Sequence, residues 1–191
     1  KTKSMPAAIT GEKNPELRIT ELLPNPKGKD AGKEWIELFN PSETTNIAGW
    51  TIQINSRKHI FGQTILESNS HTEIKLAIPL PNTEAQIALF DYTGNLVDQT
   101  QYVSTQEDKA YSKISESWIW TTPTPGQPNP SIDIIEGVIT EIDEISQTIT
   151  VSGLEIFVAA ENFTPNEQVK LKTLNHEGSL VLTEILQSIK P

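Results

Sequence analysis

Short apolar segments, repeatedly interrupted by turn residues, constrain this chain more than any other feature of its sequence. The clearest case is residues 17–41, LRITELLPNPKGKDAGKEWIELFNP, where two apolar segments flank a loop rich in proline and glycine. Proline removes a hydrogen-bond donor and restricts the backbone, whereas glycine and asparagine favour turns. The pattern therefore predicts two β-strands joined by a loop.

A glutamate lies between apolar residues in each of these two strands. Because side chains alternate along a strand, one side of each is expected to carry the following residues: Ile19, Glu21 and Leu23 in the first strand, and Trp35, Glu37 and Phe39 in the second. The two glutamates are then expected to face each other across the pair.

Composition narrows the class of protein. The 191 residues include 13 prolines and 10 glycines, and no apolar run approaches the roughly 20 residues of a membrane-spanning helix, so we expect a soluble all-β chain without direct membrane insertion. A net charge of -10 argues against unaided binding to nucleic acid or anionic lipid. The absence of cysteine excludes disulfides, thiolate zinc sites and cysteine nucleophiles.

The first 15 residues are polar and without periodicity, so we expect residues 1–15 to be a flexible leader. The chain begins at Lys1 and shows no hydrophobic signal core. This start predicts a segment of a longer chain, with its targeting information elsewhere.

Short alternating segments, separated by turn residues, continue as far as Trp120. They are 50–55, 59–61, 72–78, 85–90, 96–103 and 110–120. Such a series is typical of a two-sheet, immunoglobulin-like β-sandwich, which we assign to residues 16–129. The turn Asp91–Asn95 predicts a hairpin, because Gly94 or Asn95 can adopt the positive φ that such turns need.

Five further strand-like segments follow a proline-rich boundary at residues 128–131. They are 132–142, 147–151, 154–158, 167–172 and 179–185. Short strands with glycines at the bends suit a small closed barrel, which leaves no sheet edge unpaired. We therefore expect an all-β chain: an immunoglobulin-like β-sandwich followed by a small five-stranded β-barrel, OB-like or SH3-like, at residues 131–191.

Five motifs stand out in the first part: ITELLPNP at 19–26, EWIELFNP at 34–41, IAGWTI at 47–52, GNLVDQTQY at 94–102 and PTPGQPN at 123–129. Together they resemble the lamin-tail domain family, in the version found in bacterial exported and surface proteins. The resemblance covers about residues 17–129 and implies an immunoglobulin-like fold by a separate route. It also implies an extracellular or cell-surface location.

The acidic residues of the segment 17–41 are a candidate calcium site. Hard cations collect several oxygen ligands from loops and adjoining strands, and the candidate ligands are Glu21, Asp30, Glu34 and Glu37, with the amide of Asn25. No fixed-spacing calcium motif is present, and three lysines (Lys27, Lys29 and Lys33) lie in the same loop. The favoured alternative is therefore solvated or lysine-paired carboxylates, without a cofactor.

Aromatic residues supply a second candidate site. Trp118 and Trp120 share one face of their strand, so they either form an exposed platform for a glycan or a proline-rich peptide or pack in the core. Trp35 and Trp50 are assigned to the core. The three histidines lack zinc-ligand spacing and are expected in turns or at the surface. In the barrel, Phe157 and Phe163 have few basic neighbours, which argues against base stacking.

No nucleophile elbow, phosphate-binding loop or dinucleotide fingerprint is present, so we expect no catalytic residues and no enzyme activity. The favoured hypothesis is a non-catalytic interaction, adhesion or scaffold module of an exported bacterial surface protein, with a protein or glycan partner. The alternatives are an accessory region of a larger secreted hydrolase, such as a nuclease, and a single-strand nucleic-acid binder acting through the barrel.

Overall fold

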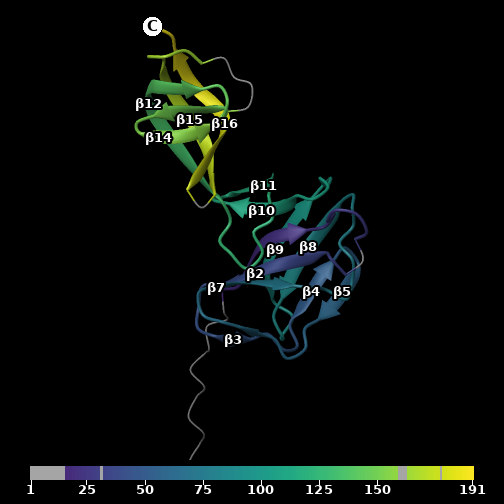
Figure 1. The fold of residues 1–191 in the computed structure, drawn as a ribbon. Helices are drawn as coiled ribbons and strands as arrows, with labels where there is room; N and C mark the ends of the chain where they lie inside the picture. Colours follow the sequence, from purple (N-terminus) through teal and green to yellow (C-terminus); the bar gives the residue numbers. More distant parts are fainter. Residues whose placement is uncertain (1–15, 31, 159–162, 177) are drawn as a thin grey trace, which may run out of the picture. The chain divides into compact units, whose positions relative to one another are not determined.

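The computed structural model describes residues 16–30, 32–158, 163–176 and 178–191, and these residues form strands, turns and loops (Figure 1). The all-β prediction is confirmed. No helix among the described residues is long and apolar enough to cross a membrane. The predicted leader, residues 1–15, lies outside the described residues.

The chain divides into two compact units: Lys1–Tyr111 with Thr122–Gln127, and Ser112–Thr121 with Pro128–Pro191. The strands up to Thr121 are β1 (Arg18–Leu23), β2 (Trp35–Asn40), β3 (Thr45–Asn46), β4 (Thr51–Ile54), β5 (Arg57–Ile60), β6 (Ile65–Leu66), β7 (Ser70–Ile74), β8 (Ala85–Phe90), β9 (Leu96–Tyr102), β10 (Ala110–Ile114) and β11 (Ser117–Thr121).

These strands form two larger sheets, with the orders β11-β10-β1-β2-β7 and β5-β4-β8-β9, and a small pair, β3-β6. The predicted immunoglobulin-like sandwich corresponds to the two larger sheets. The sandwich core follows from alternation within the strands: in β4, Ile52 and Ile54 are buried and their neighbours are only partly so. Trp35 and Trp50 are buried, so their assignment to the core is confirmed.

Strand β1 departs from simple alternation, because all its residues from Ile19 to Leu23 are buried. Ile19 pairs with Leu38, and Glu21 pairs with Glu37, so Thr20 is the extra residue of a β-bulge. Leu38 and Glu37 are neighbours on β2 and point to opposite faces. Ile19 therefore lies on the other face from Glu21, and the prediction that placed both on one side is wrong.

The predicted hairpin between β8 and β9 is confirmed, and a buried aspartate organises it. The carboxylate of Asp91 accepts hydrogen bonds from the Thr93 amide (2.8 Å) and hydroxyl (2.7 Å), and from the Asn95 amide (2.9 Å) and side chain (3.0 Å). These bonds, the Thr93 hydroxyl first, hold the pKa of Asp91 far below its usual range. Gly94 has φ of 89°, which a residue with a side chain rarely adopts.

The second unit contains a closed five-stranded barrel, as predicted, and Figure 1 labels four of its strands: β12, β14, β15 and β16. The strands β12 (Ser131–Asp143), β13 (Thr148–Val151), β14 (Leu154–Phe157), β15 (Gln168–His176) and β16 (Ser179–Ile189) close in the order β12-β13-β14-β16-β15. The β14–β16 pair is parallel. A Cβ atom at Gly137 would collide with the hydroxyl of Ser152, which lies in the turn between β13 and β14. Glycine at position 137 therefore allows β12 to approach that turn closely.

Candidate functional site

The two strand glutamates face each other, as predicted, but they are not at the surface. Glu21 and Glu37 are direct partners in the β1–β2 register, and 0% of each residue is exposed. We expected these carboxylates to be exposed to solvent or paired with lysines. Both are buried instead, so that expectation is wrong. Burial of an ionised carboxylate is strongly unfavourable unless hydrogen bonds compensate it, so its partners must come from the protein.

Three donors surround the carboxylate of Glu37. Its Oε1 accepts a hydrogen bond from the Thr20 hydroxyl at 2.7 Å, and Nδ1 of His71 lies 2.8 Å from the same oxygen. Its Oε2 accepts the amide N–H of Gly126 at 2.8 Å. The Thr20 bulge supplies one donor, and strand β7 supplies the histidine.

His71 is therefore not a free surface or turn histidine, which corrects the sequence expectation. Only 15% of its side chain is exposed, and its ring stacks on Phe39, with centroids 4.5 Å apart and planes at 28°. Phe39 and His71 are partners in the β2–β7 register, so the strand pairing itself places this ring beside Glu37.

Glu21 accepts its hydrogen bonds from Thr124. The Thr124 amide lies 3.1 and 3.3 Å from the two carboxylate oxygens, and the Thr124 hydroxyl lies 3.2 Å from each. Thr124 is itself buried. The two carboxylates together therefore hold residues 122–127 against the sheet.

The sequence of that segment explains its bonding. In Pro123-Thr124-Pro125-Gly126, the prolines have no backbone N–H, and only Thr124 and Gly126 can donate from the backbone. Each of these two donors reaches one buried carboxylate. Gly126 has φ of 74°, a conformation that favours glycine. We call this arrangement of Glu21, Glu37, Thr124 and Gly126 the carboxylate clamp.

The other three predicted calcium ligands, Asn25, Asp30 and Glu34, are not part of the clamp. Asp30 accepts a hydrogen bond from the Asn82 side chain at 2.6 Å. Burial raises the pKa of Glu34, a backbone hydrogen bond at Leu80 opposes this, and the charge of Asp30 raises it further. No group of three or more His, Asp or Glu side chains among the described residues is placed to hold a metal ion.

The predicted aromatic platform lies on β11. Trp118 and Trp120 are both partly buried, so each is intermediate between an exposed platform and a core residue. On the barrel, Phe157 is partly exposed and Phe163 packs against the apolar core. Lys170 and Lys172 are paired with Glu136 (3.2 Å) and Glu184 (3.4 Å).

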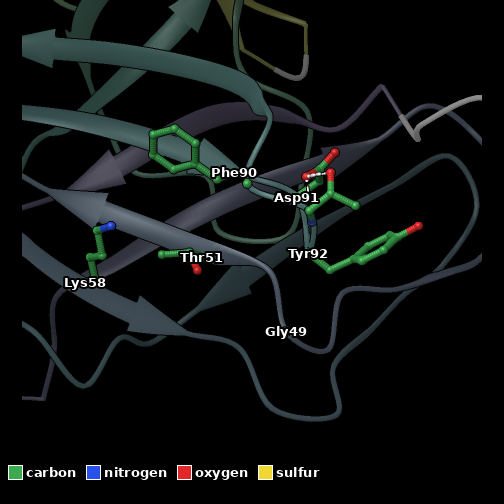
Figure 2. Close-up of a pocket in the computed structure, with 8 residues that line it drawn as sticks. Gly49, Thr51, Lys58, Phe90, Asp91 and Tyr92 are labelled. Atoms are coloured by element: carbon green, nitrogen blue, oxygen red, sulfur yellow. Dashed lines mark hydrogen bonds between the residues drawn. The ribbon is translucent and has the colours of Figure 1, made fainter.

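A surface hollow of about 350 Å³ lies beside the β8–β9 hairpin (Figure 2). The residues that line it are Gly49, Thr51, Lys58, Phe90 and Tyr92, together with Asp91, Thr93 and Gly94 of the hairpin turn. In Figure 2 the Asp91 carboxylate is turned to its own hairpin, where it bonds to Thr93, and Tyr92 and Lys58 lie on either side of Thr51. Tyr92 is 68% exposed, which is unusual for a residue of its size.

Reasoning from sequence missed this hollow and the partners of the clamp. The hollow had a detectable signal, because Phe90 is the last outward residue of an alternating strand, and the hairpin turn follows it directly. The clamp also had one, because PTPG leaves an N–H at every second residue. Their connection to Glu21 and Glu37 was not detectable, since 103 and 89 positions separate the bonded residues.

Two β-sheets packed as a sandwich define an immunoglobulin-like module. Residues 10–104 match the family model of the Lamin Tail Domain, so the resemblance that the motifs suggested is confirmed over this part of the chain. Lamin tail domains are immunoglobulin-like, non-catalytic domains. No curated protein and no solved structure matches the chain.

Proposed function

We propose that this chain is a non-catalytic interaction module of an exported bacterial surface protein, serving in adhesion or as a scaffold. The observation that carries the proposal is the carboxylate clamp. Glu21 and Glu37, which face each other across the β1–β2 pair, are buried and bonded to the backbone of the protein's own segment 122–127. A general acid or base must reach the proton of a substrate, and these two carboxylates face the protein instead.

The proposal is tested by turnover. The purified chain is incubated with nucleic acid, peptide and ester substrates, beside Glu37→Gln and His71→Asn variants whose folding has been checked by circular dichroism. We expect no turnover above the level of these two variants. Hydrolysis that persists through purification and is lost in a folded Glu37→Gln variant would contradict a non-catalytic role.

The surface location rests on the family resemblance and has a separate test. The parent reading frame should encode a secretion signal and a surface anchor. A catalytic hydrolase domain in the same frame would instead favour the alternative, in which this chain is the accessory region of a secreted enzyme.

The barrel supports a further alternative. Its strand order, with a parallel pair between the third and fifth strands, favours an OB-like fold, and OB-folds often bind single-stranded nucleic acid. However, the ion pairs of Lys170 and Lys172 neutralise the charges that phosphates would need. Binding of the full chain to an oligonucleotide, falling steeply with added salt, would favour this alternative over ours.

A further inference from the structure

The outward face of the β5-β4-β8-β9 sheet is rich in glutamine. In antiparallel strands, directly opposed residues share a face, and the register places Gln53 beside Lys58 and Ala88, and Gln86 beside Gln101. The inward residues of β4 and β8 are apolar and buried, so the opposite set points outward. We call the outward set the glutamine face: Gln53, Lys58, Gln86, Ala88, Phe90, Gln99 and Gln101.

Most polar groups of the glutamine face are not used by the fold. Within the described part of the chain, the side chains of Lys58, Gln86, Gln99 and Gln101 make no hydrogen bond or ion pair, whereas Gln53 donates to the carbonyl of Asn55 at 2.8 Å. Each primary amide offers two N–H donors and a carbonyl acceptor. Neighbouring hydroxyl groups, which both donate and accept, match such amides well.

The face has a hollow at each end. The residues that line the hollow of about 350 Å³ include Lys58, Phe90 and Tyr92. A second hollow, of about 240 Å³, is lined by Gln86 and Gln101 and also by the acidic Glu84. Phe90 and Gln86 are four residues apart on β8, about 13 Å along the strand. Between them lies Ala88, which is partly buried and has only a methyl side chain. This arrangement suits an extended ligand with repeated units better than one compact molecule.

The larger hollow favours a ligand that carries a negative charge. Asp91 lines it, but its carboxylate already accepts four hydrogen bonds from Thr93 and Asn95. Lys58 therefore has no anionic partner among the described residues that line this hollow. The ring faces of Phe90 and Tyr92 suit the apolar face of a sugar ring, since rigid aromatic side chains supply contact area at little entropic cost.

We propose that the glutamine face binds an acidic polysaccharide, one with carboxylated sugar units. A sugar carboxylate pairs with Lys58, one sugar ring packs against Phe90 and another against Tyr92, and ring hydroxyls bond to Gln86, Gln99 and Gln101. This proposal rests on the proposed function, because it names the partner class of the interaction module. The chain has a net charge of -10, so the attraction is local and binding weakens with salt.

The test uses the full chain and alginate hexasaccharide as the probe, with cellohexaose as a neutral control of similar length. Isothermal titration is run at low and at physiological salt. We expect alginate to bind, and Lys58→Gln to weaken it about three- to fivefold, as for a partly exposed ion pair. Tyr92→Ala should weaken alginate and cellohexaose alike, about five- to tenfold, because it removes a stacking surface.

Lys75→Gln is the matched control, since it removes the same charge from another exposed lysine in the same unit, outside the glutamine face. It should leave alginate affinity unchanged. NMR should also show shifts of the side-chain amide signals of Gln86, Gln99 and Gln101 on alginate addition. All variants must keep the wild-type unfolding midpoint.

Three outcomes would overturn the proposal: no alginate binding at low salt, equal losses for Lys58→Gln and Lys75→Gln, or binding of cellohexaose as tight as that of alginate. Self-association that Tyr92→Ala abolishes, without saccharide binding, would instead assign the face to a second copy of this chain. None of these results bears on turnover, so the proposed non-catalytic role would fail or stand on its own test.

Discussion

Glu37 in the sandwich and Glu167 in the barrel are both buried carboxylates, but they join parts of the chain at very different separations. Glu37 accepts the N–H of Gly126, which lies 89 positions away. Glu167 accepts the amide (2.9 Å) and hydroxyl (3.1 Å) of Thr164, three positions away, and the hydroxyl of Ser188, 21 positions away. The first closes the sandwich over a long loop, whereas the second mainly closes a local turn.

This difference indicates where a buried carboxylate contributes most to the free energy of unfolding. A long-range clamp fixes a segment that has no regular strand pairing of its own, so its loss should release that segment as well as leave donors unpaired. A local clamp leaves the surrounding ladder intact when it is removed.

The largest effect is expected for Glu37→Ala. Removing the carboxylate takes away the acceptor of the hydrogen bonds from the Thr20 hydroxyl and the Gly126 amide and creates a cavity, so the free energy of unfolding of the first unit should fall by about 3 to 5 kcal/mol. Urea denaturation, monitored by tryptophan fluorescence, measures this free energy.

Glu73→Ala is the matched control for that experiment. Glu73 lies on β7 directly opposite Glu37, but its side chain is partly exposed. Its Oε1 lies 4.0 Å from Nζ of Lys75, which is a long distance for an ion pair. Its removal should cost less than about 0.5 kcal/mol. Similar losses in the two variants would show that the carboxylate clamp is not a special contributor to stability.

A smaller effect is expected in the barrel for Gly137→Ala. The added methyl group meets the Ser152 hydroxyl and approaches Val151, so the barrel should lose about 1 to 3 kcal/mol. Gly62→Ala is the control, because nothing lies within 4 Å of a Cβ atom there. The double variant Gly137→Ala, Ser152→Ala should recover part of the loss, and failure to do so would contradict a steric cause.

Glu167→Gln should cost about 1 to 2 kcal/mol at neutral pH. The Ser188 hydroxyl, followed by the Thr164 donors, lowers the pKa of Glu167 below 4.5, so the folded state favours the ionised carboxylate. Its contribution is complete above pH 4.5 and is lost as the pH falls through the lowered pKa. Wild type and variant should therefore converge in acid, and a constant gap across pH would argue against this origin.

The part of the fold that depends on local pattern was predictable from sequence. Alternation placed Ile52 and Ile54 inward, and the Asp91–Asn95 turn was visible in its residue types. The β-bulge at Thr20 was not, because a one-residue insertion leaves an apolar strand looking regular. It changed which residues share a face with Glu21.

The candidate site was predictable only in part, for a related reason. The pairing of Glu21 with Glu37 follows from two neighbouring strands, and it was expected. Their burial depends on Thr124 and Gly126, whose approach is set by tertiary structure and not by local periodicity. The sequence alone therefore predicted solvated or lysine-paired carboxylates.

The smallest effect is expected for calcium. The oxygens of Glu21 and Glu37 already accept hydrogen bonds from Thr124, Thr20 and Gly126, so a cation would have to displace these donors and enter a site closed to solvent. Millimolar calcium chloride should therefore leave the unfolding midpoint of the first unit where sodium chloride of equal ionic strength leaves it. A rise specific to calcium, lost in Glu37→Gln but retained in Asp30→Asn, would mean that the clamp opens to bind a metal. A rise lost only in Asp30→Asn would place the ion at the loop, with Glu34, and leave the clamp as a purely structural element.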